Sequence, residues 1–256
     1  MTTCRLHALA RSGSSVAAYA AAAPFSIPVA DELLGPWDRT GPPYHAPKAQ
    51  ADLVALFKAE GHRLTPPVVA LTTQLLTQMR GDAPHIVSKW PHLRPSPDEW
   101  QAAFPHDRAV YLIRNPLHRL NSLYCRSQLQ SFGPNQDLHR FKQYAAWWQA
   151  QPHRVTFDQF KSDPAAFFRA IWTGWGWTFD ETHVARAIAY AREHYHADSR
   201  VESARPASGV VSETRFALPD DAIDRYLSDD DVRAFMQTMH WSTDPRDYRA
   251  IPDSRS

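Results

Sequence analysis

The chain has 256 residues, of which 43% are hydrophobic and 12% aromatic, and this composition excludes a disordered or fibrous protein. Its 28 Lys and Arg balance 27 Asp and Glu, so the net charge of +1 provides no global attraction to nucleic acid or to a membrane surface. Two cysteines exclude a disulfide framework and favour a reducing, cytoplasmic compartment. Any anion that the protein binds must be held by a local cluster, and no apolar run is long enough to span a membrane.

The first third of the chain predicts a strand, a helix, a loop and two further helices. Residues 4–10 are apolar and predict a strand, and the Ala-rich residues 16–23, which follow a polar turn, predict a helix. Six prolines lie between 24 and 47, and this density predicts an extended surface loop folded over the body. Apolar residues at helical spacing then predict helices over 49–60 and 66–80.

The rest of the chain continues this alternation. Runs of β-branched and aromatic residues predict buried strands over 85–89, 109–113 and 154–157. Helices are predicted over 97–104, 116–129 (capped by Asn115), 138–149, 163–172, 180–195 and 219–240, and a loop over 198–214. Because strands alternate with helices, the sequence predicts one α/β domain over 1–256, with helices on both faces of a mostly parallel sheet.

The polar turn between the first strand and the first helix is a candidate anion site. It consists of Arg11, Ser12, Gly13, Ser14 and Ser15. Backbone N–H groups at a helix N-terminus favour a bound anion, small residues allow close approach, and an arginine adds positive charge. The turn lacks the GxxxxGK[ST] spacing and the later magnesium-binding Asp of nucleoside triphosphatases, which argues against hydrolysis of ATP or GTP. The alternative interpretation is a Ser-rich turn that caps the helix.

A second candidate anion site follows the strand predicted over 109–113. Arg114 lies at the C-terminal end of this strand, the edge at which open α/β sheets bind their ligands. Ser122 lies about two turns into the next helix, so the guanidinium and the hydroxyl can converge on one phosphate. The alternative is that Arg114 pairs with a nearby carboxylate and Ser122 packs within the fold.

Together and in this order, the two segments resemble the co-substrate site of the sulfotransferases that use 3′-phosphoadenosine-5′-phosphosulfate (PAPS). The residues ARSGSS resemble the 5′-phosphosulfate loop, and YLIRNPLHRLNSLY resembles the 3′-phosphate motif, whose Arg and Ser have the same spacing. RVTFDQFKSDPAAFFRAIWTGWGW is similar to the stretch that follows in these enzymes. The resemblance covers residues 4 to about 180 and implies a three-layer fold like that of P-loop nucleotide kinases.

The arginine in the loop resembles the tyrosylprotein and bacterial sulfotransferases more than the cytosolic animal enzymes. This resemblance implies that Glu32 is the catalytic base and that Lys89, with Arg11, supports the transferred sulfuryl group. His92 is the rival base, because the cytosolic enzymes carry a histidine one position earlier relative to this lysine. The order of segments also implies that the loop 198–214 closes over the adenosine and the 3′-phosphate. Arg205 is the first candidate there, followed by Ser208 and Arg200.

The resemblance implies a PAPS-dependent transferase whose acceptor is a hydroxyl or an amine of a small molecule, a glycan or a peptide. It implies no metal and no nucleic-acid partner. One alternative is a family member that binds nucleotide or an anion without turnover. Another is a phosphotransferase, which magnesium-dependent ATP binding would support.

Three other groups of residues are given structural or surface roles. His194 and His196 have no third ligand nearby, so we predict no metal site there. Arg119 and Arg126 are interpreted as solvated, with contact to an acidic acceptor as the alternative. Five tryptophans are interpreted as packing residues, namely Trp147, Trp148, Trp172, Trp175 and Trp177.

Overall fold

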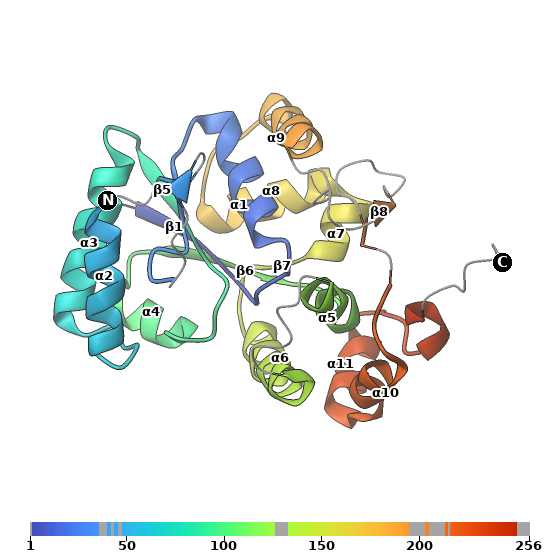
Figure 1. Cartoon of the computed structure of the whole chain (residues 1–256). Helices are drawn as coiled ribbons and strands as arrows, with labels where there is room; N and C mark the ends of the chain where they lie inside the picture. The colour runs from blue at the N-terminus through green and yellow to red at the C-terminus, as the bar shows by residue number, and fades with distance from the viewer. Residues whose placement is uncertain are drawn as a thin grey trace.

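The fold is built on a central five-stranded sheet (Figure 1). A computed structural model describes residues 2–35, 40–41, 44–45, 48–125, 133–194, 203–204, 213–214 and 216–249. The strands are β1 (Thr2–Ala8), β2 (Val29–Asp31), β5 (His85–Trp90), β6 (Arg108–Ile113) and β7 (Arg154–Thr156). They follow the spatial order β2-β5-β1-β6-β7, and every neighbouring pair is parallel. The predicted α/β fold with a parallel sheet is confirmed.

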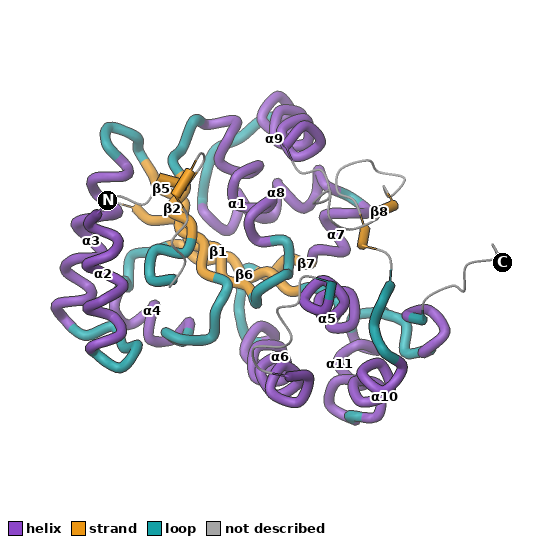
Figure 2. The backbone as a smooth tube through the Cα atoms, viewed as in Figure 1, coloured by secondary structure: helices purple, strands orange, loops and turns teal. Residues whose placement is uncertain are grey.

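One face of the sheet packs against three helices (Figure 2). They are α1 (Ser14–Ala22), α8 (Pro164–Trp175) and α9 (Glu181–His194). Because side chains alternate along a strand, Val110 and Leu112 of β6 point to this face and are fully buried with Phe168 and Trp172 of α8. The Ala-rich sequence of α1 lets that helix lie close against the sheet.

The other face is covered by a larger set of helices. Ile86 and Trp90 of β5 are buried in one cluster with α2 and α3, whereas Tyr111 and Ile113 of β6 are buried with the C-terminal helices. The helices are α2 (Lys48–Ala59), α3 (Pro66–Arg80), α4 (Pro97–Ala103), α5 (Pro116–Tyr124), α6 (Gly133–Gln149), α10 (Asp220–Ser228) and α11 (Asp230–Thr238). The sheet is therefore sandwiched between two helical layers, as predicted.

Short elements complete the described part of the chain. They are η1 (Ala23–Phe25), β3 (Thr40–Gly41), β4 (Tyr44–His45), α7 (Phe157–Ser162), β8 (Ser203–Ala204), β9 (Glu213–Thr214) and η3 (Pro245–Tyr248). The strands β3 and β4 pair with each other, as do β8 and β9, and both pairs are antiparallel. No helix in the described ranges combines the length and the apolar character that crossing a membrane requires.

The prediction of a surface loop over 24–47 is wrong for its first half. Val29–Asp31 forms the edge strand β2 of the central sheet and pairs with β5. Ala30, Leu33 and Leu34 are buried in the core. A strand of three residues between prolines carries no periodic signal of its own, and only its pairing with β5 identifies it. Residues 36–39, 42–43 and 46–47 lie outside the described residues.

Other boundaries also differ from the prediction. Helix α5 ends at Tyr124 and not at 129, and α6 begins at Gly133 and not at 138. The helix expected over 219–240 is two helices, because Asp229 ends α10 and its side chain accepts a hydrogen bond from the Val232 N–H at 3.1 Å to begin α11. Phe157, predicted as the end of a strand, begins α7.

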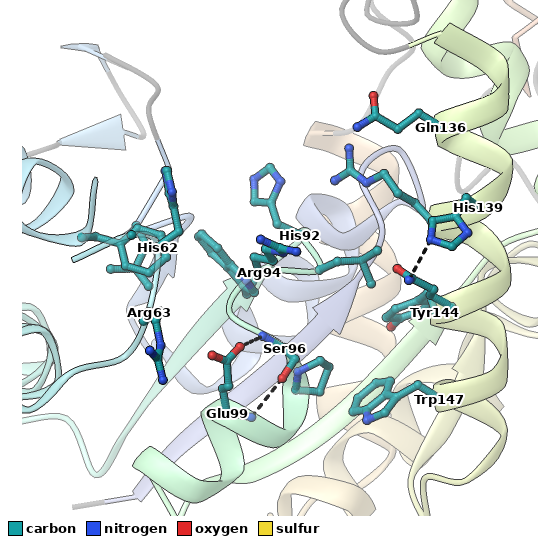
Figure 3. A pocket seen from close by; sticks show the side chains of 18 residues that line it. His62, Arg63, His92, Arg94, Ser96, Glu99, Gln136, His139, Tyr144 and Trp147 are labelled. Carbon is teal, nitrogen blue, oxygen red and sulfur yellow. Dashed lines mark hydrogen bonds between the residues drawn. The ribbon is translucent and has the colours of Figure 1, made fainter. Parts of the chain in front are cut away.

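A large pocket lies on the second face of the sheet (Figure 3). Its volume is about 1130 Å³. It is lined by the turn between α2 and α3, the segment that joins β5 to α4, and one side of α6. His92, one of the two candidate bases, is part of its lining. The segment after β5 therefore connects the sheet edge to a space that is large enough for an acceptor.

Candidate active site

The loop after β1 is shaped to begin a helix without a side-chain cap. Arg11 and Gly13 have left-handed backbone conformations, with φ of 68° and 83°. Helix α1 starts at Ser14, and no side chain caps its N-terminus. The first N–H groups of a helix have no acceptor within that helix. The Ser12 hydroxyl is buried and has no hydrogen-bond partner in the described part of the chain. The alternative of a Ser-capped turn is thus not adopted.

Gly13 lies directly against an aromatic ring. A Cβ atom at this position would be 2.1 Å from a carbon of Phe157 in α7. Gly61, in the turn after α2, also has positive φ (66°) but has open space around it. We expect Gly13→Ala to cost about 1–3 kcal/mol of folding stability more than Gly61→Ala, because only the first adds overpacking to backbone strain. Denaturant unfolding of both variants tests this, and equal losses would contradict it.

The two predicted phosphate motifs are joined by hydrogen bonds. The Arg11 Nε donates to the Ser122 hydroxyl at 3.2 Å, across 111 residues of sequence. The Arg114 guanidinium donates to the Arg11 carbonyl at 3.1 Å and lies 4.7 Å from the centre of the Phe157 ring. Arg114 and Ser122 are both buried. Two arginines and a serine from distant segments therefore form one cluster at the carboxyl edge of the sheet.

A second polar cluster surrounds Lys89 of β5. Its Nζ donates to the Ser15 hydroxyl at 2.9 Å and to Glu32 Oε1 at 2.9 Å, and it lies 2.6 Å from Asp31 Oδ1. The Lys89 side chain is only 2% exposed. Asp31 is paired in register with Lys89 because β2 lies beside β5, so the unpredicted strand places both carboxylates. Ser15 links this cluster to the loop that holds Arg11.

Glu32 joins Lys89 to His92. His92 Nε2 lies 3.5 Å from Glu32 Oε2. Burial raises the pKa of Glu32, but the contacts with His92 and the positively charged Lys89 outweigh it and lower the pKa to about 2. Glu32 is therefore ionised at neutral pH. Both candidate bases lie in one cluster, which extends from the loop after β1 to the mouth of the pocket.

Arg119 is buried and not solvated, which corrects the sequence interpretation. Its side chain is 2% exposed and forms an ion pair with Asp137 of α6, whose exposure is also 2%. It also donates to the carbonyl of Ala10, next to the loop that holds Arg11, at 3.4 Å. Helical spacing predicts that Arg119 lies near the Ser122 face. Its partner Asp137 comes from helix α6, which covers this face, and the sequence around Arg119 does not indicate that contact.

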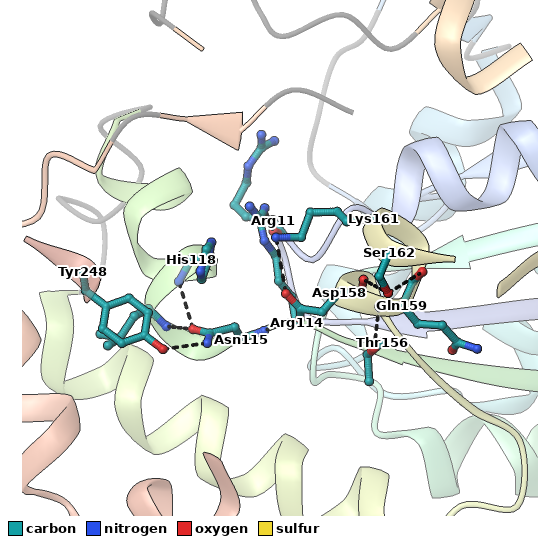
Figure 4. Close-up of polar contacts among 11 residues, drawn as sticks. Arg11, Arg114, Asn115, His118, Thr156, Asp158, Gln159, Lys161, Ser162 and Tyr248 are labelled. Carbon is teal, nitrogen blue, oxygen red and sulfur yellow. Dashed lines mark hydrogen bonds and ion pairs between the residues drawn. The ribbon is translucent and has the colours of Figure 1, made fainter. Parts of the chain in front are cut away.

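Some site residues were missed by sequence reasoning, and others lie outside the described residues. The sequence interpretation named Glu32 and did not name Asp31, which also lies beside Lys89. The available signal was that the two carboxylates are adjacent in sequence. Lys161 of α7 reaches toward Arg11 (Figure 4) and lies 3.4 Å from Asp158. Arg205, Ser208, Arg200, Arg126 and His196 lie outside the described residues, as does most of 198–214. Within the described ranges, no group of three or more His, Cys, Asp or Glu is placed to hold a metal ion.

The tryptophans pack as predicted, with one distinction. Trp148, Trp172, Trp175 and Trp177 are buried, and their indole N–H groups donate to the Tyr111, Ala21 and Arg5 carbonyls and the Cys4 sulfur. Trp147 is only partly buried and lines the pocket. The indole of Trp147 is thus available to a ligand as well as to the core.

Comparison with known proteins identifies the family. The sequence model described as "Sulfotransferase family" matches residues 9–181, well over half of the chain. Sulfotransferase STF9 from Mycobacterium avium has a similar structure, with a TM-score of 0.53, 12% identity, and coverage of 94% of this chain and 77% of that one. The sulfotransferase domain from the curacin biosynthetic pathway gives a TM-score of 0.49, 13% identity, and coverage of 93% and 97%. No curated protein matches the sequence. The chain therefore belongs to the sulfotransferase family, as its two phosphate motifs predicted.

Proposed function

We propose that this protein transfers a sulfuryl group from PAPS to a hydroxyl or an amine of an acceptor. One observation carries the proposal: the hydrogen bond from Arg11 to Ser122, reinforced by Arg114 on the Arg11 carbonyl. It joins a loop suited to the 5′ end of such a nucleotide to a pair suited to its 3′-phosphate. A nucleotide with phosphates at both ends needs two neighbouring anion sites of this kind.

The residues present fit a nucleotide with two anionic ends. The first N–H groups of α1, the Arg11 guanidinium and the unpartnered Ser12 hydroxyl would hold the 5′ groups. Arg114 and Ser122 would hold the 3′-phosphate, because a guanidinium and a hydroxyl both donate to phosphate oxygens. The charges of the loop and of Lys89 come from side chains, so this binding requires no metal ion.

PAPS, when bound, supplies a sulfuryl group attached to a phosphate oxygen that can leave. Transfer forms a bond from the acceptor oxygen or nitrogen to sulfur and breaks the bond from sulfur to that phosphate oxygen. Negative charge then grows on the leaving oxygen. Lys89 Nζ and Arg11 are fixed positive groups that would stabilise this charge more in the transition state than in the ground state.

The acceptor must lose a proton, and we assign its removal to His92. A carboxylate whose pKa is held at about 2 is a weak base at neutral pH, so Glu32 is better suited to position another group. Since Nε2 of His92 faces Glu32, this ring nitrogen would donate to the carboxylate and Nδ1 would take the proton. The sequence resemblance favoured Glu32 as the base; in this proposal Glu32 becomes the positioning residue.

Binding of two nucleotides to two variants tests the proposed site. We expect Arg114→Ala to weaken binding of 3′-phosphoadenosine-5′-phosphate (PAP) by roughly 10- to 100-fold and to weaken AMP binding much less, because the 3′-phosphate loses a charged hydrogen-bond donor, whereas the 5′ loop loses only a supporting bond to the Arg11 carbonyl. Arg11→Ala should weaken both. Calorimetric titration measures these affinities, with Arg186→Ala on the exposed side of α9 as control. An Arg114→Ala protein that loses PAP and AMP equally, or neither, would contradict the assignment.

A further inference from the structure

The pocket beside His92 has more room than a single-ring acceptor fills. Its volume of about 1130 Å³ exceeds the upper range of about 1,000 Å³ usual for sites of drug-sized ligands. Trp90 and His92 line it next to the Lys89 and Glu32 cluster. Trp147 of α6 lines another part of its wall (Figure 3). An acceptor whose hydroxyl reaches His92 would therefore extend along this pocket.

The pocket has an excess of positive charge. Arg63, Arg94 and Arg140 line it from three separate elements: the turn after α2, the segment after β5, and helix α6. Among the described residues that line it, the only carboxylate is that of Glu99. This carboxylate accepts the Ser96 N–H at 2.6 Å within the cap of α4. The chain as a whole has a net charge of +1, so this excess is local.

Two of these arginines have no ionic partner among the described residues. In the part of the chain that the structure describes, neither Arg63 nor Arg94 forms an ion pair, and both are exposed. Two arginines with structural roles differ in both burial and pairing: Arg5 is buried and paired with Asp107, and Arg119 is buried and paired with Asp137. The guanidinium groups of Arg63 and Arg94 are therefore available to a ligand, and their fork geometry suits a carboxylate or a sulfate.

We infer that the acceptor is anionic: besides the group to be sulfated, it carries a carboxylate or sulfate that Arg63 and Arg94 bind. This inference rests on the proposed function and names the substrate class for the same site. Arg63 and Arg94 determine specificity and take no part in the chemistry at His92. In Figure 3 Arg94 lies close to His92, and Arg63 lies farther from it beside His62, so the anionic group can be held along this side of the pocket while the hydroxyl faces the base.

Matched acceptors that differ in one charge test the inference. The probes are 3-(4-hydroxyphenyl)propionate and a glucuronate-containing disaccharide, each with its methyl ester, which keeps every hydroxyl and removes the charge. The two pairs also distinguish an aromatic acid from an acidic sugar. Binding to the PAP-loaded protein is measured by calorimetry, and transfer is measured with labelled PAPS. We expect at least one acid to bind roughly tenfold or more tightly than its ester, with a preference that weakens as salt rises.

Variants show which residues carry this preference. Arg63→Ser and Arg94→Ser should each reduce the preference for the acid, whereas Arg186→Ser on α9 should leave it intact. Both pocket arginines are exposed, so these variants are expected to fold, and Arg63→Glu should reverse the preference. Esters that bind as tightly as the acids, acids that do not bind at about 10 mM, or a preference unchanged by the variants would each overturn the inference.

Failure of the inference is distinguishable from failure of the proposed function. If PAP binds and is lost in Arg114→Ala while acids have no advantage, only the acceptor class is wrong. If PAP does not bind, the proposed function fails, and the acids can still be titrated against the protein alone.

Discussion

Replacing His92 with alanine is expected to lower kcat by about 10²- to 10⁴-fold and to leave PAP affinity unchanged. Removal of a positioned general base has an effect of this size, because the acceptor must then lose its proton to water. Glu32→Gln keeps the shape of the side chain and removes its charge, so we expect a smaller loss of kcat. Transfer rates at saturating PAPS and acceptor measure both effects.

The pH dependence of kcat separates the two candidate bases. A protonated imidazole cannot accept a second proton, so activity that depends on His92 is lost where its ring is protonated. Activity that depends on Glu32 would persist to much lower pH, since the pKa of this carboxyl is lowered to about 2. If His92→Ala is active while Glu32→Gln is inactive, and the acidic fall in rate lies far below neutrality, Glu32 is the base and the assignment is wrong.

Arg119→Ala is expected to destabilise the fold by about 3–5 kcal/mol, which corresponds to a fall in Tm of roughly 10 °C. The substitution removes the ion-pair partner of the Asp137 carboxylate, which is only 2% exposed and also accepts a hydrogen bond from the Tyr226 hydroxyl at 2.5 Å. Thermal and denaturant unfolding measure the loss.

An exposed ion pair provides the control for Arg119. Arg169 pairs with Glu181 at 2.6 Å, but the two side chains are 40% and 77% exposed. Arg169→Ala should therefore cost no more than about 1 kcal/mol. The double variant Arg119→Met/Asp137→Leu should recover stability relative to Arg119→Ala, because it leaves no buried charge. Equal losses in Arg119→Ala and Arg169→Ala would show that burial of the pair has no consequence.

Much of the fold could be predicted where local sequence carries the signal. The β-branched and aromatic run at Ala109–Ile113 predicted β6, and Asn115 followed by Pro116 predicted the start of α5. The Asn115 side chain does accept hydrogen bonds from the Leu117 and His118 N–H groups. Strand β2 was missed because three residues cannot show a period. Its stability comes from pairing with β5, which lies more than fifty residues later in the chain.

The sequence predicted the separate motifs of the site, but not the contacts that join them. Spacing identified Arg11, Arg114 and Ser122, but their mutual hydrogen bonds depend on two strands lying side by side in the sheet. The contact between Glu32 and His92 depends on β2, so the two appeared in the sequence as rivals and not as partners. The burial of Arg119 depends on α6 in the same way, because Asp137 is separated from it in sequence but adjacent in space.

The most direct test of the central claim is calorimetric titration of the wild-type protein with PAP, compared with AMP and with ATP plus magnesium. The account predicts that PAP binds at one site without a metal ion, and that removal of its 3′-phosphate weakens binding by at least about tenfold. Absence of PAP binding, or tighter binding of ATP with magnesium, would contradict PAPS as the sulfuryl donor.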